Sequence, residues 1–318
     1  MGGDKQPIHI VADFGTGGGA CAQAIAFGKA LAGAALQGWH TGHPSRAAAG
    51  FPGGLKTVSA FGGSYPVGGT LVIVGPGQAF SPWIERRRAA RLIVWSDSAD
   101  GEALFRLLGV LRASRLPEAE LALSCRQLSE TLGVEARLVP PLLAVPPVPA
   151  RRANPYPRIA AVGVEPADWS RYKSWSLAGI DIVLPPIPGL QLPAEWAGIT
   201  LAPAEEAFAA GLAGADIFVT PAPAPGGGLP FHPLCRAMAA GCAVVASGEG
   251  LDEWISDGET GLLARDGASL YEQAVDLARH PERCRRLGEA ARSRAEALGG
   301  RAVQAALAAW LQAAPASV

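Results

Sequence analysis

The stretch that decides the fold is DIFVTPAPAPGGGLPFHPLCRAMAAG, from Asp216 to Gly241. It begins with a short apolar run that ends at Thr220, passes through a loop rich in Pro and Gly, and becomes helical from Leu234. An apolar run without alternation predicts a strand buried on both faces, as in a parallel sheet. Between a strand and a helix, a Gly-rich loop presents free backbone N–H groups to an anionic ligand. The competing interpretation is a loose surface loop.

The same order of strand and helix recurs along most of the chain. Repeated alternation predicts an α/β protein with parallel sheets and right-handed crossovers. The other predicted strands are Ile8–Phe14, Leu71–Val74, Leu92–Trp95, Leu121–Ser124, Arg137–Val139, Ile159–Val164, Ile180–Leu184 and Ala243–Ser247.

The predicted helices include Ala20–Leu31, Glu102–Leu111, Glu205–Leu212 and Leu270–Leu298. Ser269 and Glu272 have the spacing of a capping box at the start of the last one. A break is expected in that helix near His280 and Pro281, because proline cannot continue a helix without losing a hydrogen bond.

Prolines crowd the middle of the chain, from Pro140 to Pro157, and such a segment runs extended rather than joining a central strand. We therefore expect two doubly wound domains, 1–150 and 151–300. Residues 301–318 form a helix and tail in which Val303, Leu307, Trp310 and Leu311 share one face. That apolar face needs a surface, so the helix is expected to pack back on the first domain.

Composition narrows the class of protein. The 318 residues are 49% hydrophobic and 17% charged, which excludes a disordered chain. The 27 basic and 28 acidic residues nearly cancel, so a nucleic-acid partner is not expected. The five cysteines and five histidines are scattered, which predicts buried reduced thiols, a cytoplasmic location and no metal site. No apolar run is long enough to cross a bilayer.

A second Gly-rich turn, Gly15-Thr-Gly-Gly-Gly19, follows the first predicted strand. Its glycines Gly17 and Gly18 let backbone amides approach a phosphate or a sugar, and a tight turn without a ligand is the alternative. The spacing differs from G-x-G-x-x-G, and no ribose-binding acid follows about 20 residues later. A nicotinamide-dependent dehydrogenase is therefore the weakest of the functions considered.

Three segments, two of which overlap the opening stretch, carry a resemblance to a known family. Gly214–Pro221, Arg236–Ser247 and Gly250–Leu263 are similar to the C-terminal half of the group 1, family 4-like glycosyltransferases, and the match continues through Gly288–Arg292. These are retaining enzymes of the GT-B fold. The resemblance implies two Rossmann-like domains that face each other across a cleft. It implies a nucleotide-sugar donor bound mainly by the C-terminal domain and an acceptor bound mainly by the N-terminal one.

The chain departs from the family at the donor site. The family carries two glutamates in the second Gly-rich segment, one for the donor sugar and one for the ribose. The corresponding positions here are Gly228 and Arg236. A guanidinium only donates hydrogen bonds, so donor recognition is expected to use instead backbone amides of the loop that contains Gly227, Gly228, Leu229 and Pro230, or His232 or Arg236. Arg236 is either a phosphate ligand or a solvated helix residue.

The family's diphosphate-binding cations are also displaced. The arginine expected after Gly163 is absent, and the nearest cations are Arg171 and Lys173, of which Lys173 is the better candidate by position. Fixed cations there stabilise the charge of a departing diphosphate, and surface solvation is the competing interpretation. With cations in that role, no metal and no other cofactor are required.

Two further side chains are candidates for catalysis. Asp97 follows a predicted strand, where many relatives carry a histidine, and either accepts a hydrogen bond from an acceptor hydroxyl or caps the next helix. His232 lies in the second Gly-rich loop, where it either approaches the donor sugar or has no role.

The resulting prediction is transfer of a sugar from a nucleoside-diphosphate donor to a hydroxyl of a saccharide, lipid-linked or small-molecule acceptor. The main alternative is a catalytically inactive GT-B protein that binds a sugar or nucleotide or serves as a partner subunit. The basic triplet Arg86–Arg88 allows weak contact with the inner face of the membrane, and the C-terminal helix allows a homodimer.

Overall fold

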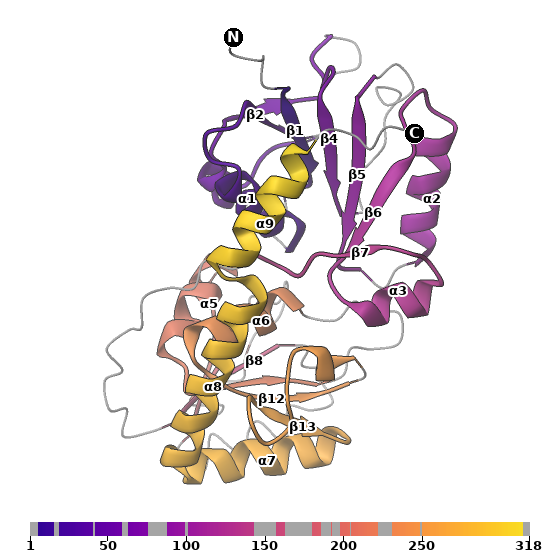
Figure 1. Cartoon of the computed structure of the whole chain (residues 1–318). Helices are drawn as coiled ribbons and strands as arrows, with labels where there is room; N and C mark the ends of the chain where they lie inside the picture. The colour runs from indigo at the N-terminus through magenta and orange to yellow at the C-terminus, as the bar shows by residue number, and fades with distance from the viewer. Residues whose placement is uncertain are drawn as a thin grey trace. The chain divides into compact units, whose positions relative to one another are not determined.

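The computed structural model describes residues 6–15, 19–40, 42–58, 63–75, 88–98, 101–142, 157–162, 180–185, 192, 198–203, 205–221, 231–248 and 250–313. By their internal contacts these residues divide into two compact units (Figure 1). Unit 1 contains the described parts of 1–142 and 301–318, and unit 2 those of 143–225 and 229–300. The predicted domain boundary near residue 150 falls outside the described residues.

Unit 1 is built on a parallel sheet of seven described strands in the order β3-β2-β1-β4-β5-β6-β7. The central strands β1, β4 and β5 are buried along their whole length, which explains why most of their residues are apolar. The strands are β1 (Ile8–Ala12), β2 (Leu36–His40), β3 (Leu55–Thr57), β4 (Thr70–Val74), β5 (Arg91–Ser96), β6 (Ala119–Leu123) and β7 (Arg137–Leu138).

Helices cover both faces of this sheet. On one face, side chains of β1, β4 and β5 form a core with α1 (Gly19–Ala30), the 3-10 turn η1 (Arg46–Gly50) and α9 (Arg301–Gln312). Helix α9 contributes Leu307 and Leu311 and lies beside α1 in Figure 1, which confirms that the C-terminal helix packs on the first domain. The remaining helices are α2 (Gly101–Arg112), with its inner leucines buried, and α3 (Arg126–Leu132).

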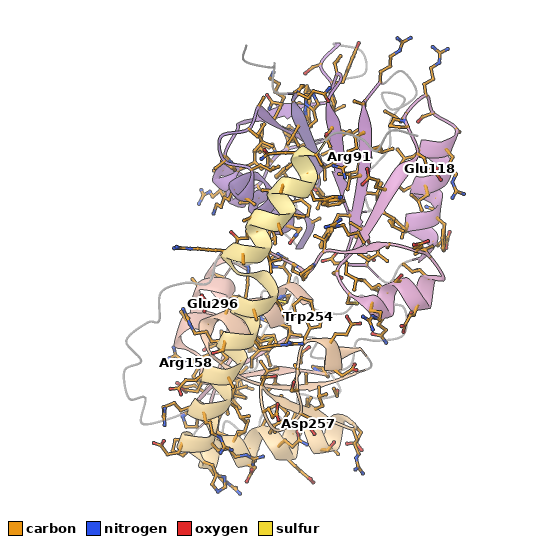
Figure 2. All side chains as sticks on the ribbon, viewed as in Figure 1. Arg91, Glu118, Arg158, Trp254, Asp257 and Glu296 are labelled. Carbon is orange, nitrogen blue, oxygen red and sulfur yellow. The ribbon has the colours of Figure 1, made fainter. Side chains whose placement is uncertain are left out.

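Arg91 fixes the end of α9. Its guanidinium bonds both carboxylate oxygens of Glu120 at 2.5 and 2.6 Å and donates to the carbonyl oxygen of Trp310 at 2.5 Å. The guanidinium groups of Arg91 and Arg137 both lie over the Trp310 ring, at 5.1 and 4.8 Å from its centroid. Figure 2 shows Arg91 where the helix ends. A cation at the carbonyl end of a helix satisfies its free acceptors and opposes its dipole.

Unit 2 is built on a parallel sheet of six described strands in the order β10-β9-β8-β11-β12-β13. Apolar residues from all six form a core with α7 and the start of α8 on one face of the sheet. The strands are β8 (Arg158–Ala161), β9 (Asp181–Leu184), β10 (Ile199–Leu201), β11 (Ile217–Thr220), β12 (Ala243–Ser247) and β13 (Leu262–Ala264).

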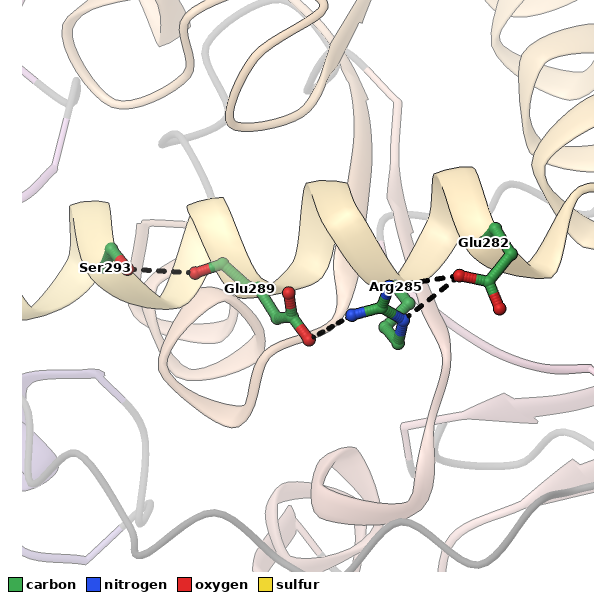
Figure 3. Close-up of polar contacts among 4 residues, drawn as sticks. All are labelled: Glu282, Arg285, Glu289 and Ser293. Atoms are coloured by element: carbon green, nitrogen blue, oxygen red, sulfur yellow. Dashed lines mark hydrogen bonds and ion pairs between the residues drawn. The ribbon is translucent and has the colours of Figure 1, made fainter.

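The helical elements of unit 2 are α5 (Glu205–Gly211), η4 (Leu212–Gly214), α6 (Phe231–Ala240), η5 (Leu251–Glu253), α7 (Gly267–Arg279) and α8 (Pro281–Gly299). Helix α8 packs so tightly on the turn after α6 that a Cβ at Gly288 would lie 2.1 Å from the carbonyl oxygen of Gly241. Its solvent side carries a ladder of ion pairs, in which Arg285 bridges Glu282 and Glu289 (Figure 3).

The structure confirms the α/β class and the helix break at Pro281, which begins α8. All five cysteines are buried, and none of them forms a disulfide bond. The predicted capping box is wrong: Asp266 is the N-cap of α7. Its carboxylate accepts a hydrogen bond from the Ser269 N–H, and its own N–H donates to the Ser269 hydroxyl oxygen. The physical reason is that Asp266, three residues earlier, accepts a hydrogen bond from the Ser269 N–H. The helix therefore begins after Asp266, and Ser269 lies inside its first turn.

Candidate functional site

Each sheet contains one point where the chain reverses its direction of winding. In unit 1 it lies between β1 and β4, and in unit 2 between β8 and β11. Helices or loops that leave neighbouring strands at such a point diverge to opposite faces, which leaves a crevice at the carboxyl ends of the strands. Ligands of open α/β sheets bind in such crevices, so the residues at these two edges are the candidates for ligand binding.

At the unit 2 edge, β11 ends at the fully buried Thr220 and α6 begins at Phe231. His232 therefore lies in the first helical turn, which corrects its predicted place in the loop before the helix. The helix starts before Pro233 because proline is tolerated in a first turn, where its missing N–H has no partner to lose.

His232 is only 8% exposed, and its Nε2 has no hydrogen-bond partner among the described residues. Burial, together with the positive charge of Arg236, lowers the pKa of His232 to about 3. The imidazole is therefore neutral at physiological pH. It offers one hydrogen-bond donor and one acceptor but no charge.

Arg236 is partly buried and follows His232 by four residues, so the two side chains share one face of α6. The start of α6 thus combines N–H groups that have no partner within the helix, the partial positive charge of the helix dipole and a guanidinium. Such a combination favours an anion.

At the unit 1 edge, β5 ends at the buried Ser96 and Asp97 follows. The Ser96 hydroxyl accepts a hydrogen bond from the Ser98 N–H, so a serine rather than Asp97 stabilises this turn. Burial raises the pKa of Asp97 above its ordinary value, against a smaller opposite effect of its own backbone N–H. The neighbouring strand β6 is followed by Ser124, a buried hydroxyl without a partner among the described residues.

On the other side of the same edge lie polar residues that the sequence did not single out. His40 at the end of β2 and Ser45 before η1 each bury a polar atom with no partner in the described part of the chain. Strand β2 was not among the predicted strands, so nothing placed its last residue at the ligand edge. The useful signal was the position of Gln37-Gly-Trp-His40 directly after the first helix, where a strand–helix–strand unit needs its second strand.

The remaining predicted site residues lie outside the described residues. They are Gly17, Gly18, Arg171, Lys173, Gly227, Gly228, Leu229 and Pro230. Among the described candidates, α6 brings His232 and Arg236 together, while Asp97 belongs to the other unit. The described side chains include no group of three His, Cys, Asp or Glu arranged to hold a metal ion. None of the described helices is both long and apolar enough to span a membrane.

Comparison with known proteins adds to this picture. Residues 188–280, which include β11, α6 and β12, match the family model described as "Glycosyl transferases group 1". No curated protein sequence matches the chain.

Solved structures match over nearly the whole chain at low sequence identity. HepE from Anabaena, in complex with UDP and glucose, aligns with a TM-score of 0.67 at 12% identity and covers 96% of this chain and 98% of its own. The sucrose-phosphate synthase of Thermosynechococcus elongatus aligns at 0.66 and 17%, with the same coverage. A glycosyltransferase from Rickettsia africae aligns at 0.63 and 10%, covering 97% and 99%. The chain therefore has the GT-B fold, and within it residues 188–280 match the group 1 glycosyltransferases.

Proposed function

We propose that the protein is a glycosyltransferase that moves a sugar from a nucleoside-diphosphate sugar to an acceptor hydroxyl. The observation that carries the proposal is the start of α6, where the buried neutral His232, Arg236 and free helix N–H groups gather at the switch point of unit 2. This arrangement suits a diphosphate. The family match covers the same elements, and the structurally similar HepE binds UDP and glucose.

In the proposed reaction the bond between the anomeric carbon and the diphosphate breaks, and negative charge grows on the leaving diphosphate. Arg236 and the N-terminus of α6 stabilise that negative charge, and the cations Lys173 and Arg171 stabilise it further. With cations in this position the transfer needs no metal. The neutral His232 hydrogen-bonds the donor sugar or phosphate. The loop of Gly227, Gly228, Leu229 and Pro230 completes the donor site with the backbone N–H groups of its non-proline residues.

The acceptor binds unit 1 in this proposal. Asp97 accepts a hydrogen bond from the acceptor hydroxyl, and its raised pKa suits a group that takes up a proton in the reaction. In the same proposal, Gly17 and Gly18 let backbone amides approach the ligand. The product keeps the anomeric configuration of the donor, and the enzyme works in the cytoplasm, in contact with the inner membrane face where the acceptor is lipid-linked.

The test is turnover. The full chain is incubated with UDP-glucose and GDP-mannose in the presence of EDTA, and release of the nucleoside diphosphate is followed with and without added saccharides. We expect release from one donor that EDTA does not suppress and a product with retained configuration by NMR. Loss of release in Lys173→Ala, with the melting temperature unchanged, would support the proposed clamp.

An inactive GT-B protein is the second candidate, because neither family glutamate is present at positions 228 and 236. The two candidates differ in one observable. An inactive protein that keeps the binding site is stabilised by a nucleoside diphosphate but releases none from any donor sugar, whereas the enzyme does both.

A further inference from the structure

The carboxyl edge of unit 1 contains a second polar site on the side of β1 and β2, away from Asp97. His40 is the last residue of β2 and pairs with Thr57 of β3. Its imidazole shares a sheet face with Gly38, where a Cβ would meet Phe51, so it points toward the side covered by η1.

His40 is held from one side only. Its Nε2 lies 3.3 Å from the hydroxyl of Thr57, while Nδ1 is buried and has no partner in the described part of the chain. The whole residue is 6% exposed. A buried ring nitrogen left without a hydrogen bond costs free energy, so a native structure that keeps one needs a reason for it.

Ser45 reaches the same edge from the segment that follows β2. Its N–H donates to the carbonyl oxygen of Phe14 at 2.7 Å, and a Cβ on Gly15 would lie 3.1 Å from the carbonyl oxygen of His43. The segment therefore lies against the turn at the end of β1. Ser45 is the N-cap of η1, yet its buried hydroxyl makes no capping bond and no other bond to a described residue.

Two buried polar atoms without partners among the described residues thus occur at the carboxyl ends of the neighbouring strands β1 and β2. A serine hydroxyl and an imidazole nitrogen are the groups that bind the hydroxyls of a saccharide. If each atom forms a hydrogen bond with a ligand hydroxyl, binding removes the free-energy cost of leaving the two atoms without partners.

The charge of this half of unit 1 indicates what else the ligand carries. No Asp or Glu occurs between Asp13 and Glu85, whereas Arg46 directly follows Ser45 and Lys56 lies on β3. Both cations are exposed, and neither has a carboxylate partner among the described residues. Asp13, which precedes this acid-free stretch in the sequence, accepts a hydrogen bond from the Gly15 N–H at 2.8 Å.

We propose that His40 Nδ1 and Ser45 Oγ bind hydroxyl groups of the acceptor and that the acceptor is an acidic saccharide, whose phosphate or carboxylate pairs with Arg46. That this ligand is the acceptor substrate rests on the proposed function. That His40 and Ser45 bind a saccharide does not depend on it. His40 and Ser45 position the ligand, and Arg46 selects acidic saccharides over neutral ones.

The experiment is calorimetric titration of the full chain with four probes: glucose 6-phosphate, glucuronate, methyl glucoside and inorganic phosphate. We expect glucose 6-phosphate or glucuronate to bind more tightly than methyl glucoside and inorganic phosphate. Whichever acidic sugar binds identifies the acidic group as phosphate or carboxylate. UDP is titrated in parallel to test the donor site.

The variants separate the two roles. Ser45→Ala weakens the acidic sugar by about fivefold, the value of one hydrogen bond, while the melting temperature is unchanged because no existing bond is lost. Arg46→Gln weakens the acidic sugars and leaves methyl glucoside unaffected. His40→Gln repeats the Ser45→Ala result if it folds. Ser114→Ala, at the far end of α2, is the matched control and binds as the wild type does.

Equal affinity for methyl glucoside, equal affinity for inorganic phosphate, no binding of any probe, or wild-type affinity in Ser45→Ala would each overturn the inference. Because UDP is measured separately, these results leave the proposed function standing. If the acidic sugar binds and UDP does not, the proposed donor site is contradicted and the saccharide site inferred here stands.

Discussion

Arg236 lies one helical turn beyond His232 on α6, and its positive charge acts with burial to lower the pKa of His232 to about 3. The arginine is thus the permanent charge of this helix start, and the histidine is a neutral hydrogen-bonding group. A ligand phosphate would meet one cation, the helix N–H groups and an uncharged imidazole. This division of roles leads to the first prediction.

Stability should fall as pH drops below the ordinary histidine value of 6.5. The unfolded chain binds a proton on His232 below that pH, whereas the folded chain does not until pH approaches about 3. Unfolding is therefore favoured across that window, by about 2 kcal/mol between pH 6.5 and 5. Urea denaturation of wild type and His232→Gln over this range measures the difference. The variant should show a shallower pH dependence, and identical slopes would mean that His232 is solvated in the folded protein.

Asp97 provides the second prediction, because its two interpretations differ in sign. Burial that raises the pKa disfavours the carboxylate in the folded state, so Asp97→Asn should unfold at an equal or higher temperature at pH 7. A helix-capping aspartate would instead lose stability on the same change. As a catalytic residue, Asp97→Asn should lower turnover by about 100-fold or more. A destabilised but active variant would assign Asp97 to the cap.

The anchor of α9 gives the third prediction. Removing Arg91, which is 5% exposed, leaves Glu120 and the carbonyls of Trp310 and Ala313 without this donor, so Arg91→Ala should cost about 3 kcal/mol. Glu120 is 43% exposed, so Glu120→Gln should cost only about 1 kcal/mol. Chemical denaturation at pH 7 measures both.

The same pair has a pH signature. Hydrogen bonds from Arg91 lower the pKa of Glu120, so its contribution is present above the ordinary value of 4.5 and is lost as pH falls through the lower folded pKa. Glu120→Gln should lack this acid limb. Arg285→Ala is the control: its ion pairs on α8 are exposed to solvent (Figure 3), and its removal should leave the melting temperature unchanged. A larger loss in Arg285→Ala than in Arg91→Ala would contradict this account of α9.

The fourth prediction compares two helical glycines. Gly288→Ala places a methyl group against the carbonyl of Gly241 and must push α8 away, which should cost about 2 kcal/mol or more. Gly109 on α2 is exposed and has open space around its Cα, so Gly109→Ala should stabilise by about 0.5–1 kcal/mol. Melting temperatures that move in opposite directions confirm the contact, and parallel shifts contradict it.

Strands that are buried at the centre of a sheet could be predicted from the sequence, whereas short and peripheral strands could not. The central strands were predicted from unbroken apolar runs such as Leu71–Val74, whereas β2, β3, β10 and β13 were missed. These four are short or lie toward the sheet edges, and β2 carries Gly38, which has little strand preference. The break before α8 was predicted because Pro281 acts locally, without tertiary context.

The candidate site was harder to predict than the fold. Sequence patterns located Asp97, His232 and Arg236 near strand or helix ends. They did not indicate that His232 is buried and neutral, because its pKa depends on what packs around it. His40 and Ser45 were missed because an unpaired buried atom is a property of the folded chain alone.

The central claim, a nucleoside diphosphate held at the start of α6, is tested most directly by calorimetric titration with UDP, GDP and TDP. Wild type should bind one of them selectively, and Arg236→Gln should bind it at least about tenfold more weakly, since one charged hydrogen bond is worth about 1.5–3 kcal/mol. Arg285→Gln, an arginine on the solvent side of α8, should bind as the wild type does. Absence of binding by all three nucleotides at millimolar concentration, or undiminished binding by Arg236→Gln, would contradict the account.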